Sequence, residues 1–250
     1  MSALLAAVLV AVATSSPAPA PSPDFARDSN WDTGKAEVIT YSTTSSQRAP
    51  YESRLAIRKG LTAKKNVASL EMIYDSDAGN RHESAVSRFE RATFRPIEIE
   101  AAWSDSSGRR TVHVRVQESE LAARSEGDAV LRVPSVDPHP LFYDVLPSML
   151  RAYDLSTPST FSVLLLPTQL SREIPSATLI PAEVVFHGHA GRPSETSRGG
   201  LQVDVRHQGK TDRMWFHPGP GHELLVWERA DGTTLTYKKS ERRIYEEKPD

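Results

Sequence analysis

Ile97-Glu98-Ile99-Glu100-Ala101-Ala102-Trp103 and Thr111-Val112-His113-Val114-Arg115-Val116 decide the fold class of this 250-residue chain. In both runs apolar and polar side chains alternate, which is typical of a β-strand with one buried face. The turn-forming run Asp105-Ser106-Ser107-Gly108 separates them, so they predict an antiparallel hairpin. The side chains expected to share its buried face are Ile97, Ile99, Ala101, Trp103, Val112, Val114 and Val116. Glu98 and Glu100 are expected on the solvent side.

Shorter runs of the same kind recur on both sides of this hairpin, separated by turn residues. They are residues 36–41, 54–58, 68–74, 84–89, 130–133, 160–166, 182–187, 201–205, 213–216, 224–228 and 233–237. Asp231-Gly232, a strong turn dipeptide, joins the last two runs. We therefore predict a mainly β fold: a single curved antiparallel meander or half-barrel, with its strands paired in sequential order.

One helix is predicted over residues 141–153, where apolar side chains recur at four-residue spacing. Pro147 lies inside this segment. A proline within a helix removes one backbone hydrogen bond and clashes with the preceding turn. We therefore expect the helix to be short and kinked.

The N-terminus carries an uninterrupted apolar run over residues 3–13, too short to span a membrane. Such a run followed by small residues predicts a signal peptide over 1–13. Residues 14–30 contain four prolines and are expected to form a linker, and residues 31–250 a single β-rich domain. The expected location is periplasmic or secreted, with no transmembrane span after signal removal. Because no basic residue precedes the apolar run, a misassigned start codon or an Ala-rich tail is the alternative interpretation.

Composition excludes several function classes. The formal net charge is −2 and both signs are interspersed, so neither nucleic acid nor an anionic surface is an expected partner. The chain has no cysteine, which excludes disulfides, thiolate metal sites and a cysteine nucleophile. No phosphate-binding glycine loop or Gly-x-Ser-x-Gly motif occurs. We therefore expect no cofactor and favour a protein without enzymatic activity.

Four aromatic residues in predicted strands suggest where a ligand would bind. They are Trp103, Phe186, Trp215 and Trp227. On a curved sheet such side chains can line an apolar concavity that holds a lipid or another hydrophobic small molecule. The competing interpretation is that all four belong to the core.

Two histidines in one predicted strand offer the alternative function. His187 and His189 are separated by one residue, so on a strand they point to the same face and can share a metal ion. With His207 as the third ligand, they would form the centre of a metal-dependent β-barrel enzyme. The competing interpretation is an exposed strand end before a polar loop.

The C-terminal runs Met214-Trp215-Phe216-His217-Pro218, Glu223-Leu224-Leu225-Val226-Trp227-Glu228 and Asp231-Gly232-Thr233-Thr234-Leu235 resemble the closing segment of a bacterial periplasmic family of unknown function. Gly34-Lys35-Ala36-Glu37-Val38-Ile39-Thr40-Tyr41 is similar to the start of related exported proteins, so the resemblance extends from Gly34 to Tyr245. It implies an exported curved β-sheet, broadly similar to the half-barrels of periplasmic lipoprotein carriers, which hold acyl chains in their concave face. It implies no catalytic residues and identifies no protein partner.

Overall fold

Among the residues that it describes, the computed structural model contains fifteen strands and one short helix. It describes residues 36–46, 48–61, 67–76, 81–90, 95–105, 108–116, 120–125, 131–134, 140–143, 146–166, 180–190, 199–219 and 221–243. The first nine strands are β1 (Ala36–Ser45), β2 (Arg48–Leu61), β3 (Val67–Ser76), β4 (Arg81–Glu90), β5 (Pro96–Asp105), β6 (Gly108–Val116), β7 (Glu120–Ser125), β8 (Leu131–Pro134) and β9 (Pro140–Phe142). After helix α1 (Leu146–Leu150) come β10 (Ser159–Leu166), β11 (Ile180–His189), β12 (Leu201–His207), β13 (Lys210–Phe216), β14 (Leu224–Glu228) and β15 (Thr234–Arg243).

All fifteen strands belong to one sheet with the order β8-β7-β6-β5-β4-β3-β2-β1-β15-β14-β13-β12-β11-β10-β9. Nearly every strand pairs antiparallel with its neighbours in the sequence, as expected for a meander. The pairing of β1 with β15 joins the first and last described strands, from Ala36↔Arg243 to Thr44↔Thr234. At the other end of the order, β9 pairs parallel with β10.

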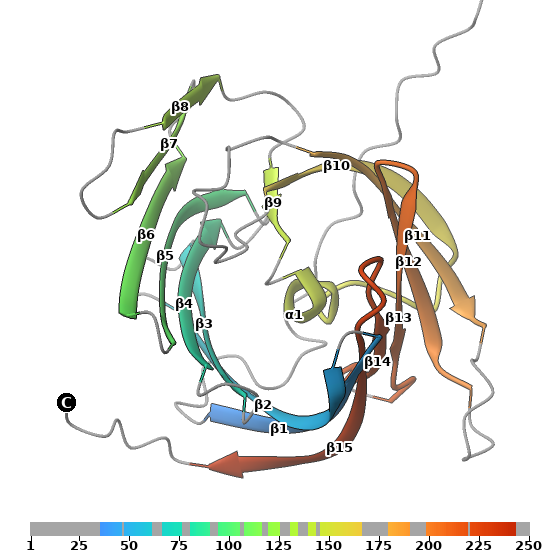
Figure 1. The fold of residues 1–250 in the computed structure, drawn as a ribbon. Helices are drawn as coiled ribbons and strands as arrows, with labels where there is room; N and C mark the ends of the chain where they lie inside the picture. Colours follow the sequence, from blue (N-terminus) through green and yellow to red (C-terminus); the bar gives the residue numbers. More distant parts are fainter. Residues whose placement is uncertain are drawn as a thin grey trace, which may run out of the picture.

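The sheet curls into an incomplete ring around α1 (Figure 1). Its two edge strands, β8 and β9, do not pair with each other, so the barrel is not closed. Strand β5 approaches β9, and β6, β7 and β8 continue beyond that point at the upper left of the ring (Figure 1). The mainly β, curved antiparallel fold predicted from the sequence is confirmed.

A row of directly opposed residues defines the concave face of the sheet. Across β11 to β1 the row runs Phe186↔Val203↔Met214↔Trp227↔Leu235↔Thr43. Directly opposed residues in antiparallel strands share a face. Most of the row's apolar side chains belong to the same buried cluster as Leu146, Met149 and Leu150 of α1. The core therefore lies between α1 and the concave face.

The predicted helix is short, as expected, but covers fewer residues than 141–153. Leu141, its expected first apolar residue, lies in β9, and only Leu146–Leu150 is helical. Pro147 is the second residue of α1, and the amide groups of a first helical turn have no intrahelical acceptor in any case. The proline is therefore accommodated in the first turn of α1 without the loss of an intrahelical hydrogen bond.

The predicted hairpins are confirmed. Ile99 pairs with Val114 and Ala101 with Val112, while the last hairpin pairs Trp227 with Leu235. Strands β7 and β9 were not predicted. The proposed signal peptide 1–13 and linker 14–30 lie outside the described residues. Within the part of the chain that the structure describes, no helix has the length and apolarity needed to cross a membrane.

Candidate functional site

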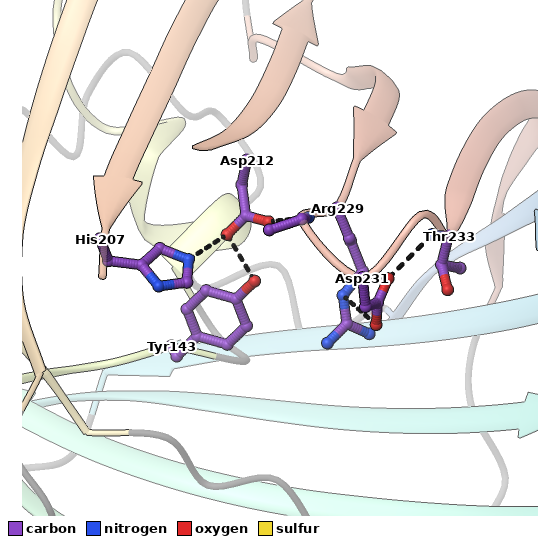
Figure 2. Close-up of polar contacts among 7 residues, drawn as sticks. Tyr143, His207, Asp212, Arg229, Asp231 and Thr233 are labelled. Carbon is purple, nitrogen blue, oxygen red and sulfur yellow. Dashed lines mark hydrogen bonds and ion pairs between the residues drawn. The ribbon is translucent and has the colours of Figure 1, made fainter. Parts of the chain in front are cut away.

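Asp212 is completely buried and binds three hydrogen-bond donors from separate elements. Its Oδ2 accepts from the Tyr143 hydroxyl at 2.6 Å and from His207 Nε2 at 3.1 Å (Figure 2). Its Oδ1 accepts from the Ala230 amide at 2.6 Å. Tyr143 follows β9, His207 ends β12, and Ala230 lies in the β14–β15 turn. Asp212 thus holds together one end of the barrel, and we call these four residues the aspartate cluster.

The aspartate cluster determines which atoms of Tyr143 and His207 donate to the carboxylate. Burial, and then the neighbouring Asp212 carboxylate, raise the pKa of Tyr143 far above its usual value, so its hydroxyl remains a donor. Because a carboxylate only accepts hydrogen bonds, His207 carries a proton on Nε2. His207 Nδ1 is buried and makes no hydrogen bond within the described structure.

Arg229 lies beside the aspartate cluster and is stacked on two aromatic rings. Its guanidinium carbon is 5.9 Å from the centroid of the Tyr143 ring and 5.2 Å from that of Trp227. The two rings are themselves 6.0 Å apart. Both distances from the cation are within cation–π range, so the rings restrain the guanidinium group. The Arg229 side chain is 23% exposed, which leaves it accessible from solvent.

The β14–β15 turn holds the backbone of Arg229 in place. The Arg229 amide donates to Thr233 O at 2.8 Å, and Gly232 takes the positive φ of 83° that the tight connection requires. Asp231 Oδ1 accepts from the Thr233 amide at 2.8 Å (Figure 2). Burial disfavours the Asp231 carboxylate, but this hydrogen bond and the Arg229 charge outweigh it and lower its pKa. The turn therefore carries a stable anion on its outer side.

An apolar wall continues from Arg229 along the concave face. Trp227 is directly opposed by Leu235, and Tyr237 follows two residues later in β15. Leu235 and Tyr237 pack against the core cluster but remain only half-buried. Trp227 Nε1 is a buried donor that makes no hydrogen bond within the described structure. We call Trp227, Leu235 and Tyr237 the β14–β15 wall.

A second buried polar contact fastens the chain after α1 to the sheet. Arg151 Nη1 donates to Glu37 Oε2 at 2.7 Å, and Arg151 Nε donates to the Gly221 carbonyl at 2.6 Å. The side chains of Arg151 and Glu37 are 2% and 5% exposed. This contact is enclosed, so we assign it to stability and not to binding.

Phe186 and Trp227, two of the four aromatic residues predicted to bind a ligand, belong to the buried cluster on the concave face, whereas Trp215 does not. Phe186 is in the core, 5.4 Å from the Phe161 ring, and Trp227 belongs to the β14–β15 wall. Trp215 alternates with the core residues Met214 and Phe216 and lies on the opposite face. The backbone of Trp103 pairs with Glu83 and Arg110, but its side chain lies outside the described residues.

The three histidines of the alternative metal site are not brought together. His187 Nε2 lies 3.2 Å from Asp204 Oδ2, and the exposed His189 is opposed by Leu201 at the start of β12. His207 ends β12, six residues away and so roughly 20 Å along the strand. Among the described residues, no group of three or more His, Asp or Glu side chains is placed to hold a metal ion.

Tyr143, Asp212 and Arg229 were missed by the sequence analysis. Asp212 lies two residues before Met214, so it occupies a core position of β13, and Arg229 lies two residues after Trp227. A charged residue in the apolar phase of a strand is the signal that would have found Asp212. Tyr143 has no comparable signal, because the short strand before it was not predicted.

The fold and the site together define an open, β-barrel-like protein with a short internal helix and a polar cluster at one end of its concave face. No protein-family model matches the chain, and no curated protein matches it. It is similar to a solved β-barrel-like protein of the domain of unknown function DUF1849 from Brucella abortus, with 8% identity, a TM-score of 0.51, and coverage of 84% of this chain and 98% of that one. It also matches a DUF1089 family protein from Pseudomonas aeruginosa, with 8% identity, a TM-score of 0.40, and coverage of 75% and 95%. At such identity the first likeness shows a shared fold alone.

Proposed function

We propose that this is an exported, non-enzymatic binding protein that holds a lipid or another hydrophobic ligand against the concave face of its sheet. One observation carries the proposal: Leu235 and Tyr237 face the core cluster and are nevertheless only half-buried. Apolar side chains on the inner wall of a curved sheet are normally covered, because each one left partly in water forfeits a fraction of the roughly 1.5–3 kcal/mol that full burial contributes. A hydrophobic ligand would cover them.

The position of α1 supports a ligand site on this part of the concave face. All five residues of α1 are buried, and the cluster around them includes residues of β9 to β14 together with residues of β1 and β4. Leu235 and Tyr237 of β15 pack against that cluster but stay partly exposed. The ligand would thus complete the packing that the helix begins.

Export is part of the same proposal and rests on the sequence. The apolar run 3–13, the proline-containing segment behind it and the resemblance to exported proteins favour a periplasmic or secreted location. Fractionation of the producing cell tests this separately: recovery of the intact, uncleaved chain in the cytosol would contradict it.

The binding proposal is tested with a dansyl-labelled long-chain fatty acid. We expect saturable binding to the purified chain and an increase in probe fluorescence. Leu235→Asp should weaken binding at least about tenfold, because it places a charge in the apolar wall. Thr236→Asp is the matched control, since this exposed residue lies on the other face of the same strand. Its affinity should remain within about twofold of the wild type.

If the Leu235→Asp variant unfolds, loss of binding can no longer be distinguished from loss of structure. Tyr237→Ser removes apolar surface from the wall without adding a charge, and it should also weaken binding while the melting temperature is checked in parallel. No saturable probe binding by the wild-type chain, together with no co-purified hydrophobic molecule by native mass spectrometry, would disprove the proposal.

A further inference from the structure

Leu235 and Tyr237 of β15 are the part of the core-facing surface that a ligand can still cover. Three apolar residues of the described chain pack against the core cluster and remain partly exposed: Ile180, Leu235 and Tyr237. Ile180 begins β11, which β12, β13 and β14 separate from β15. Building on the proposed function, we infer that the ligand inserts a compact apolar group of about eight carbons or fewer here, and that a longer chain leaves its remaining carbons in water.

Covered residues bound this apolar strip on both sides. Toward β14, Trp227 opposes Leu235 and is only 8% exposed. Toward β1, Thr43 opposes Leu235 and Tyr41 opposes Tyr237, and each is 1% exposed. A residue that is already covered gains little by contacting a ligand, because the hydrophobic effect scales with the apolar area removed from water. The strip is therefore one strand wide.

Beyond Leu235, the inward surface of β1 and β2 is polar. Thr43 and Ser53 share a buried hydrogen bond between Oγ1 and Oγ at 2.8 Å. Buried, hydrogen-bonded hydroxyl groups offer no apolar area to an alkyl chain. The half-buried Tyr51 opposes Thr43, so this polar pair separates it from Leu235. A chain that spread sideways from Leu235 would thus meet polar groups that are already covered.

The strip is also short along β15. Leu235 and Tyr237 are two residues apart, which corresponds to about 7 Å along a strand. On one side lies the β14–β15 turn, where the Thr233 amide donates to the Asp231 carboxylate (Figure 2). On the other side, the register of β15 against β1 shifts directly after Tyr237. Such a bulge bends the strand and changes the direction of the side chains that follow. A polar turn and a bulge therefore limit the strip at its two ends.

A series of unbranched alcohols tests the size limit, because its members differ only in chain length. Butanol, hexanol, octanol, decanol and dodecanol compete for the dansyl-labelled fatty acid on the full chain, each below its solubility limit. From butanol to octanol we expect the affinity to rise about two- to fourfold for each added CH₂ group, because each one removes further apolar area from water. Beyond octanol the affinity should rise less than about 1.3-fold for each CH₂ group, since the additional carbons stay in solvent.

Variants of β15 then assign the size limit to the strip. Leu235→Ala should weaken octanol and dodecanol by the same factor, at least about fivefold, because both alcohols use the same apolar surface. Thr236→Ala, on the other face of the same strand, is the matched control and should keep both affinities within about twofold of the wild type. Melting temperatures show whether the variants are folded. If Leu235→Ala is not, Tyr237→Ala is judged by the same criterion.

An affinity that keeps rising by a constant factor for each CH₂ group up to dodecanol would overturn the size limit and leave the proposed function standing. An octanol affinity that is unchanged in a folded Leu235→Ala variant would show that the apolar group binds elsewhere, and it would also overturn the inference. Failure of the probe and of every alcohol to bind would instead reject the proposed function, and the inference with it.

Discussion

The guanidinium group of Arg151 and the carboxylate of Glu37 form an ion pair at 2.7 Å in which both side chains are almost fully buried. Glu37 lies in β1, next to the seam with β15, while Arg151 directly follows α1. The pair therefore holds the helical segment against the strand where the two halves of the sheet meet. Removing water from two charges is expensive, so such a pair stabilises the fold only while both partners are present.

Arg151→Met should lower the free energy of unfolding by about 3–5 kcal/mol, because it leaves the Glu37 carboxylate buried without its cation. The double variant Arg151→Met/Glu37→Met should recover most of that loss, since no buried charge remains. Urea denaturation measures both. Arg206→Met is the control: it breaks the Arg206–Glu183 contact, whose side chains are 50% and 45% exposed, and should cost less than about 1 kcal/mol. A double variant as unstable as Arg151→Met would contradict this account.

Asp212→Asn should destabilise the protein by about 2–4 kcal/mol. The substitution removes the carboxylate to which Tyr143, His207 and Ala230 donate, and it turns an NH₂ group toward these donors. Asp231→Asn changes an exposed turn residue in the same way and should cost less than about 1 kcal/mol. Thermal unfolding of the two variants compares them. Equal losses would show that the aspartate cluster does not hold the barrel end together.

Stability should fall as the pH rises above about 10, the usual pKa of tyrosine. Burial raises the pKa of Tyr41, Tyr143 and Tyr153 in the folded chain. A raised pKa means that the folded state keeps its protons where the unfolded chain releases them, so this stabilisation is complete below pH 10 and is lost above it. Urea unfolding curves recorded from about pH 8 to about pH 11 measure this loss of stability. Tyr153→Phe should reduce the slope of the unfolding free energy against pH by up to about 1.4 kcal/mol per pH unit. An unchanged slope would argue against burial of Tyr153 as a cause of the pH dependence.

Gly188→Ala should cost more than Gly209→Ala, although both glycines have a positive φ, of 68° and 71°. A Cβ at Gly188 would lie 2.8 Å from the Ser156 carbonyl oxygen, whereas one at Gly209 would meet nothing within 4 Å. We expect a loss of about 1 kcal/mol at Gly209 from backbone strain alone and about 2–4 kcal/mol at Gly188. Equal melting temperatures for the two variants would contradict the close approach of Ser156.

The hairpins could be predicted because their information is local. Alternation with a period of two and a turn dipeptide such as Asp231-Gly232 specify a strand pair without reference to the rest of the chain. The Ile99↔Val114 and Trp227↔Leu235 pairings follow that logic. The same logic failed at residues 141–153, where four-residue spacing predicted a helix and tertiary pairing with β10 made Pro140–Phe142 a strand.

The site was only partly predictable because its residues are far apart in the sequence. Trp227 was identified, but Tyr143 and Asp212 meet across 69 residues. Glu98, on the convex face, is a second residue whose contacts could not be predicted from its sequence neighbours. It was expected to be solvated, yet Arg88 and His113 bind it at 2.8 and 2.6 Å. The hydrogen bond from His113, and then Arg88, lower its pKa.

The sequence alone determined the class of structure: alternating strands, tight turns and the absence of cysteine specify a curved antiparallel sheet stabilised by packing. Only the tertiary structure decided that β1 pairs with β15, that α1 lies inside the ring, and that Asp212 joins Tyr143 to His207. The physical reason is range. A strand's alternation is fixed by its own backbone geometry, whereas a buried polar contact depends on which distant strands the curvature of the sheet brings together.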